Sequence, residues 1–176
     1  QLLFCDWGVP KPGLVSTYTR LRDGLIAAGV PAGMIRFVHE ATDDKSKAAL
    51  FGACRDGKVA VLIASTEKAG MGTNVQTRLF AVHHVDAPWR PADMEQRDGR
   101  ALRPGNTYAT VQVYRYLTRG TFDAYTYAAL ARKAHIPAQL IKAATDPTIR
   151  DVDELGEVEI GYQQLAALAS GNPLLL

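Results

Sequence analysis

The chain has 176 residues with 47% hydrophobic and 22% charged residues, a composition typical of one globular domain with a core, which excludes disordered and collagen-like chains. The formal net charge of +2 is too small to diagnose nucleic-acid binding, so any such function must come from local sites. No apolar run approaches the ~20 residues that cross a bilayer and no basic signal segment opens the chain, so we expect a cytoplasmic protein without a membrane partner.

Strand and helix patterns alternate along the first two thirds of the sequence. Short apolar runs rich in branched residues predict strands at 1–6, 34–40, 58–65, 79–86 and 111–117. Helix patterns lie between them at 14–28, 44–55 and 91–102. This alternation predicts an α/β fold with a mainly parallel central sheet and helices on both faces. The run VAVLIA predicts a central strand covered on both sides, although a buried helix reads the same.

The character of the sequence changes after residue 120. A long helix pattern at 121–144 is interrupted at Pro137, and a polar, acidic stretch then leads to YQQLAALAS at 162–170. We therefore predict a lobe at 1–120 and a helical C-terminal extension at 121–176, packed on the lobe or trailing from it. Because the chain begins on a strand pattern rather than with Met, we expect a piece of a longer protein.

Several stretches resemble motifs of other kinds of site but lack the residues or the placement that those sites require. GACRDGK (52–58) fits the start of a phosphate-binding P-loop, but Val59 replaces the Mg²⁺-binding Ser/Thr and the loop precedes a strand. His83 and His84 are neighbours on a strand and face opposite sides, so they are poorly placed to share a metal. The two cysteines stand in no CxxC motif. We expect no P-loop, metal site or disulfide framework in this chain.

The loop STEKAGMGTN (65–74) follows the apolar run VAVLIA. Thr66 ends the strand, Gly70 and Gly72 permit a positive φ or close approach to a ligand, and Asn74 adds a short polar side chain. Ligands of open parallel sheets bind beyond the carboxyl ends of strands, so this loop suits phosphate or ribose contacts. An ordinary tight turn accounts for the glycines equally well.

The stretch MEQRDGRALRPGN (94–106) predicts a helix with one polar stripe. Gln96, Arg100 and Arg103 fall within about 60° of one another around the helix. Gly99 borders this stripe and leaves room for a bulky group, at a cost of about 1 kcal/mol against Ala. The pattern therefore suits an anion.

A solvated basic face is the alternative interpretation of the same helix. It pairs Asp93 with Arg97 at positions i and i+4. Arg100 and Arg103 then have no good carboxylate on their face, so composition alone leaves the two interpretations about equal.

Four stretches resemble motifs of superfamily 2 helicases, in the family's order. QRDGRALRPGN (96–106) resembles motif VI, ASTEKAGMGTN (64–74) motif V, and LLFCD (2–6) motif IV. PWRPADMEQ (88–96) is similar to the W-N-P lead-in of SNF2-type proteins. Residues 1–118 thus resemble the second RecA-like lobe of SNF2-type helicases. More narrowly, VYRYLTRGTFDAYTYAAL (113–130) and LAALASGNP (165–173) resemble the large helicase and adenine-methylase proteins of phages and bacterial mobile elements.

The resemblance implies a RecA-like three-layer fold and three groups of site residues. Catalytic arginine fingers and an ordering glutamine would be Arg100, Arg103 and Gln96. ATP contacts would come from Gly70, Gly72 and Asn74. Nucleic-acid backbone contacts would come from Thr66, Lys68 and His39. Arg90 and Asn106 replace the family's Asn and Gln, which puts contacts at those two positions in doubt.

The implied function is that of the second motor lobe of an ATP-dependent DNA helicase or translocase. ATP with Mg²⁺ would bind mainly to a first lobe of the same polypeptide, so the 176 residues alone should be inactive. Implied partners are double-stranded DNA, that first lobe and a fused methylase domain in a bacterial or phage protein. The alternatives are an inert RecA-like module that binds DNA or protein, and an RNA helicase lobe.

Overall fold

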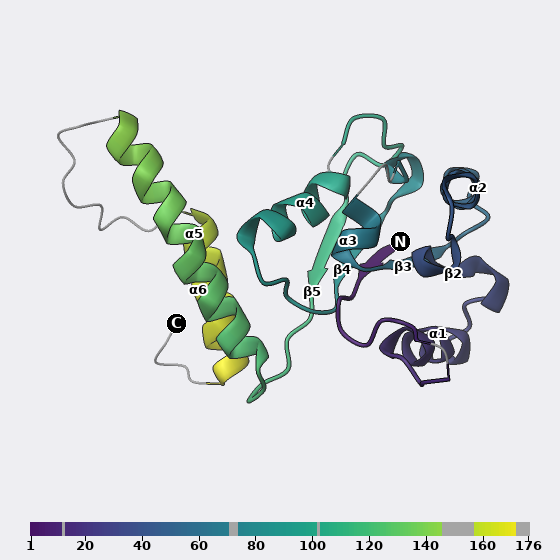
Figure 1. Cartoon of the computed structure of the whole chain (residues 1–176), viewed down its shortest axis with the longest axis horizontal. Helices are drawn as coiled ribbons and strands as arrows, with labels where there is room; N and C mark the ends of the chain where they lie inside the picture. The colour runs from purple at the N-terminus through teal and green to yellow at the C-terminus, as the bar shows by residue number, and fades with distance from the viewer. Residues whose placement is uncertain (12, 71–73, 102, 146–156, 172–176) are drawn as a thin grey trace. The chain divides into compact units, whose positions relative to one another are not determined.

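A computed structural model describes residues 1–11, 13–70, 74–101, 103–145 and 157–171 (Figure 1). The chain divides into two compact units. The first unit contains Gln1–Asp86 and Glu95–Tyr116, and the second contains Ala87–Met94 and Leu117–Leu176. The predicted boundary at residue 120 stays a prediction. No helix in the described ranges is long and apolar enough to cross a membrane.

The first unit is built on a five-stranded parallel sheet, as predicted. Its strands are β1 (Leu2–Phe4), β2 (Ile35–Phe37), β3 (Val61–Ala64), β4 (Ala81–His84) and β5 (Gln112–Arg115). Their order across the sheet is β2-β3-β1-β4-β5. All five predicted strands are confirmed, and β3, the run VAVLIA, is an interior strand buried along its whole length.

One face of the sheet is covered by α1 (Thr17–Ala27). Tyr18 of this helix packs in one cluster with strand residues that include Leu3 and Ile63. The helix begins later than predicted because Ser16 caps it: its side chain accepts a hydrogen bond from a backbone N–H of the first turn.

The opposite face carries α2 (Asp44–Arg55), α3 (Thr66–Gly70) and α4 (Pro91–Ala101) (Figure 1). Parallel crossovers are right-handed, so the direction of each step across the sheet decides which face its helix takes. From β1 the chain passes β3 to reach β2, and this step places α1 on the first face. The later steps, from β2 to β3, β4 and β5, cross the sheet in the opposite direction. They place α2, α3 and α4 together on the other face.

Two elements differ from the prediction. Residues 66–70 form the short helix α3, where an irregular loop was expected after the strand. The predicted interruption at Pro137 is also wrong, because α5 (Asp123–Thr145) runs through it. A proline removes one backbone hydrogen bond, and a helix can continue past it.

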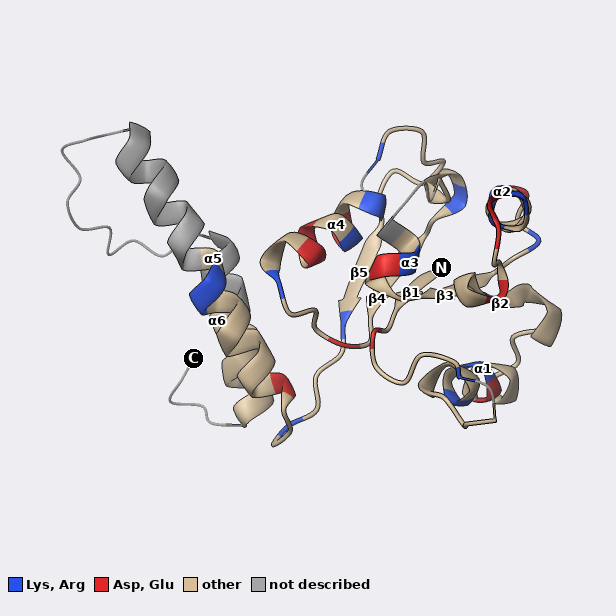
Figure 2. Ribbon diagram, viewed as in Figure 1, with Lys and Arg blue, Asp and Glu red and all other residues tan. Residues whose placement is uncertain are grey.

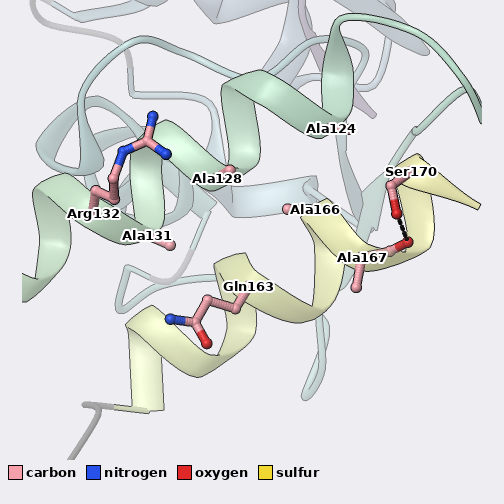
Figure 3. Close-up of a pocket in the computed structure, with 8 residues that line it drawn as sticks. All are labelled: Ala124, Ala128, Ala131, Arg132, Gln163, Ala166, Ala167 and Ser170. Atoms are coloured by element: carbon pink, nitrogen blue, oxygen red, sulfur yellow. Dashed lines mark hydrogen bonds between the residues drawn. The ribbon is translucent and has the colours of Figure 1, made fainter. Parts of the chain in front are cut away.

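The second unit is formed around α5 and α6 (Glu157–Ser170). Its core brings Met94 together with Tyr127 and Leu130 of α5. Small side chains on both helices leave a shallow groove of about 380 Å³ between them (Figure 3). The groove is lined by Ala124, Ala128, Ala131, Arg132, Gln163, Ala166, Ala167 and Ser170.

Candidate functional site

Polar residues follow the three middle strands of the sheet. Asp6 lies after β1, Thr66 after β3 and Asp86 after β4. Since the strands are parallel and β1 lies between the other two, these residues meet at one edge. Thr66 donates its backbone N–H and its hydroxyl to the Asp6 carboxylate, at 2.7 and 2.8 Å. The Asp86 carboxylate accepts backbone N–H groups of Asp6 and Trp7.

Arg97 of α4 reaches into this edge and is 1% exposed. Its Nε donates to the Thr66 hydroxyl oxygen at 2.8 Å. Nη2 donates to the carboxylates of Asp6 and Asp86 at 2.7 and 3.1 Å, and Nη1 to the Asp86 carbonyl oxygen at 2.7 Å. The guanidinium lies over the Phe4 ring, 5.2 Å from its centroid. Asp6, Thr66, Asp86 and Arg97 form what we call the edge network.

The edge network corrects the predicted pairing of Arg97 with Asp93. Asp93 instead accepts a hydrogen bond from Arg90 at 3.0 Å in the first turn of α4. Arg97 turns into the protein because it pairs there with the buried carboxylate of Asp86 and the partly exposed carboxylate of Asp6, and a buried charge is costly unless it is paired. Spacing along the helix had suggested Asp93 as the partner, at a position where an ion pair on a helix surface contributes little.

A second group ties α4 to the sheet at the next residue. Asp98 contacts the fully buried His84 of β4 through Nε2 at 2.8 Å, and Arg115 of β5 donates to it at 2.9 Å. Burial by itself raises the pKa of the Asp98 carboxyl, but the His84 hydrogen bond and the Arg115 charge outweigh it, so the pKa lies below its usual value. His83 lies on the opposite face against Tyr114, as the alternation of strand residues predicts.

Two of the predicted catalytic residues lie on α4, and the third, Arg103, lies beyond its end. Gln96 is exposed, Arg100 is half-buried, and Arg103 follows the helix with its Nε donating to the Gly99 carbonyl oxygen at 3.2 Å. Burial lowers the pKa of the Arg100 guanidinium, and the nearby positive charge of Arg103 lowers it further. The structure thus places two cations close enough to repel each other, an arrangement that an anion would stabilise. Figure 2 shows that α4 also carries acidic residues, so its surface is not uniformly basic.

Gly99 lies beside these arginines with open space around it. A Cβ added there would meet no atom within 4 Å, so packing within the described chain does not require glycine. We expect Gly99→Ala to raise helix stability by about 1 kcal/mol. If the space receives a nucleotide, the same change should raise the KM for ATP several-fold in the longer protein that carries the first lobe. Urea denaturation and steady-state ATP hydrolysis measure the two effects, and an unchanged KM would show that the space serves another purpose.

The predicted nucleic-acid contacts gather near α3. Thr66 and Lys68 belong to this helix, and His39 lies in the 3₁₀ turn Val38–Glu40, which packs against it. The Thr66 hydroxyl is engaged in the edge network, whereas Lys68 is exposed. The ring of His39 packs edge-on against Tyr18, 5.2 Å between centroids. The structure therefore brings Thr66, Lys68 and His39 close to one another, near the edge of the sheet where the parallel strands end.

The titration of His39 is expected to report this neighbourhood. Burial lowers its pKa below the ordinary value of 6.5, and the charge of Lys68 lowers it further. A histidine with a lowered folded pKa stabilises the fold above the unfolded pKa, and that stability is lost as the pH falls through the folded pKa. An NMR pH titration should place the His39 midpoint below 6.5 and move it upward in Lys68→Met. A midpoint at or above 6.5 would contradict the structure.

The predicted nucleotide contacts are only partly described. Gly70 ends α3, Gly72 lies outside the described residues, and Asn74 is exposed. The backbone oxygen of Asn74 accepts a hydrogen bond from Arg55 of α2 at 2.8 Å, which anchors the chain after the loop.

The two positions that depart from the family's pattern have local roles here. Arg90 pairs with Asp93, as described above. Asn106 donates to the Leu79 carbonyl oxygen at 2.8 Å and accepts the backbone N–H of Tyr108 at 2.9 Å. Asn106 thus holds the turn that leads toward β5.

Comparison with known proteins places this arrangement in a family. The model of the helicase conserved C-terminal domain matches residues 19–105, which contain α3, α4 and all of the edge network except Asp6. This stretch is therefore similar to a helicase C-terminal domain over just under half of the chain. The crystal structure of the C-terminal part of the Fun30 ATPase domain has a TM-score of 0.54 at 20% identity, covering 73% of this chain and 38% of that one. The likeness confirms the predicted RecA-like fold.

Two curated proteins are similar to the helicase C-terminal domain in sequence. Defense against restriction protein B of Escherichia phage P1 is 38% identical over 80 residues, and the uncharacterized ATP-dependent helicase YqhH of Bacillus subtilis (strain 168) is 36% identical over 92 residues. The matches cover 46% and 51% of this chain but only 4% and 16% of the relatives. The predicted family resemblance is confirmed for this domain.

Sequence reasoning missed Asp6, Asp86 and Arg97 as members of one group. A signal existed, because two strand patterns, LLFCD and VHHVD, both end in aspartate. Carboxylates at neighbouring parallel strand ends meet at one edge and require a buried cation. Arg97 was judged from its helix neighbours alone.

Proposed function

We propose that this chain is the second motor lobe of an ATP-dependent DNA helicase or translocase of the SNF2 type. The observation that carries the proposal is the pair of Arg100 on α4 and Arg103 just beyond its end, where Arg103 bonds to the Gly99 carbonyl oxygen beside open space. The helix α4 is tied to the carboxyl edge of the sheet by Arg97. Ligands of open parallel sheets bind at this edge.

The residues of α4 fit the phosphates of a nucleotide. Burial lowers the pKa of Arg100 and the positive charge of Arg103 lowers it further, so bound anionic oxygens would stabilise the charged guanidinium. Guanidinium groups remain charged at neutral pH and offer a planar fork of donors that matches phosphate oxygens. ATP, with Mg²⁺ held mainly by a first lobe, would supply the phosphoryl group and the free energy of its transfer.

The chain's own residues would act in three groups. Arg100 and Arg103 would hold the terminal phosphate and stabilise its developing charge, with Gln96 ordering the site. Gly70, Gly72 and Asn74 would contact the nucleotide at the end of β3. Thr66, Lys68 and His39 would contact the nucleic-acid backbone, which positions a duplex without reading its sequence.

The proposed longer protein joins this lobe to a P-loop lobe. The name of the Bacillus relative supports an ATP-dependent helicase, and the phage relative supports a phage or bacterial origin with cytoplasmic action. A fused adenine methylase is a further proposed partner domain. The isolated chain should not hydrolyse ATP, because the P-loop would come from the first lobe.

The nucleic-acid preference of the longer protein tests the proposal. ATP hydrolysis is measured without nucleic acid and with duplex DNA, single-stranded DNA or RNA. We expect the largest stimulation by duplex DNA, as suits SNF2-type translocation. Preferential stimulation by RNA would identify an RNA helicase lobe. No hydrolysis under any condition, with the nucleic acid still bound, would identify an inert binding module.

A further inference from the structure

We infer that Arg97 is a positioning residue, which sets the rotation of α4 and thereby aims Arg100 at the nucleotide. The inference rests on the proposed function, because it assigns a role toward one of the two proposed arginine fingers. Arg97 itself is too deeply buried to touch a ligand. It lies one helical turn before Arg100 on α4, so its orientation determines that of Arg100.

The contacts of Arg97 come from separate segments of the chain. Asp6 follows β1, Asp86 follows β4, and Thr66 begins α3. Four hydrogen bonds of 2.7–3.1 Å hold the guanidinium in one plane and one direction. A helix held at such a side chain cannot turn about its axis without breaking several of these bonds.

Asp98 restrains the same helix at the following residue. Its carboxylate is held by His84 of β4 and Arg115 of β5. Arg97 and Asp98 point about 100° apart around the helix, so the two ties together fix the rotation. Gln96 is left exposed and Arg100 half-exposed.

Arg97 also connects α4 to the proposed nucleic-acid contacts. The Thr66 hydroxyl donates to Asp6 and accepts from Arg97 Nε, so it lies between the two charged groups. A displacement of α3 would therefore move the Thr66 hydroxyl and change its hydrogen bond with Arg97. This gives a physical route by which a bound nucleic acid changes the aim of Arg100.

Arg97→Lys tests the inference in the longer protein that contains the first lobe. Lysine keeps the charge but loses the planar fork, so it cannot hold all four acceptors. Misplacing catalytic groups by about 1 Å can cost about 100-fold in rate, so we expect kcat for ATP hydrolysis to fall about 10- to 100-fold. The KM for ATP and the Kd for DNA should change less than about 2-fold, since ground-state contacts are untouched. Arg20→Lys, an exposed arginine on α1, is the matched control and should leave all three unchanged.

A double-mutant cycle separates positioning from a general loss of structure. If Arg97 acts through Arg100, adding Arg97→Lys to Arg100→Lys should lower kcat by less than about 2-fold. An equal fold-loss in both backgrounds would overturn the inference. So would a loss of kcat in Arg97→Lys that merely follows the fraction of unfolded protein measured by circular dichroism.

Two further measurements keep the outcomes distinct. If Arg100→Lys alone leaves kcat unchanged, the proposed function fails at the arginine pair, and this inference fails with it. If Arg97→Lys does not fold, Thr66→Val removes the hydroxyl that accepts from Arg97 Nε and donates to Asp6, and it keeps the ion pairs of Arg97. It should then lower kcat about 3- to 10-fold in the absence of DNA, by the same sensitivity to misplacement, and an unchanged value would overturn the inference.

Discussion

Arg100→Ala and Arg103→Ala are each expected to lower DNA-stimulated ATP hydrolysis by about 10³- to 10⁵-fold in the longer protein. An arginine delivered to the transferring phosphoryl group stabilises charge that develops only in the transition state. Its removal should therefore lower kcat far more than it raises the KM for ATP. Steady-state phosphate release measures both constants.

The control for this prediction is Arg20→Ala. Arg20 is an exposed arginine on α1, so its removal deletes the same charge without touching α4. Folding and DNA binding of Arg100→Ala and Arg103→Ala should stay near the parent values. Normal turnover in both variants would remove the arginine fingers from the proposed mechanism.

The second large effect is on stability. We expect Arg97→Met to lower the free energy of unfolding by about 3–5 kcal/mol, because it breaks a buried ion pair and leaves the buried carboxylate of Asp86 without its cation. Methionine matches the length of the arginine stem, so the loss comes from charge and hydrogen bonds rather than from a large cavity. Urea denaturation followed by circular dichroism measures the change.

Arg90→Met is the matched control for the stability prediction. Arg90 directly precedes α4 and pairs with Asp93 of its first turn, but the Arg90 side chain is 75% exposed. Exposed ion pairs contribute about 0–1 kcal/mol, so this variant should remain close to the parent. Equal losses in the two variants would contradict the role of the edge network.

Most of the fold could be predicted from periodicity. The strand patterns had the length and branched composition of buried parallel strands, and the helices between them had clear ends, such as the cap at Ser16. Two local errors had local causes. A single helical turn such as α3 has too few residues to show a helical period, and Pro137 ended the predicted helix although a proline interrupts only one backbone bond.

The candidate site was predictable only where its residues lie close in sequence. Gln96 and Arg100 could be grouped because helical spacing determines which side chains share a face, whereas Arg103 lies beyond the end of α4. Lys68 and His39 are 29 positions apart in the numbering and meet because η2 (Val38–Glu40) packs against α3. No spacing rule connects such pairs, and only the family resemblance had suggested them.

The sequence by itself determined the α/β class, the five strands and the polar face of α4, since each follows from a repeat within a short window. Only the tertiary structure determined the burial of Arg97 and its hydrogen-bond partners. Its partners are 91, 31 and 11 residues away, and they converge because parallel strands end at the same edge of the sheet. The buried carboxylate of Asp86 requires a cation, and this requirement draws Arg97 inward, whereas Arg100 stays half-buried on α4 and Arg103 is exposed beyond its end.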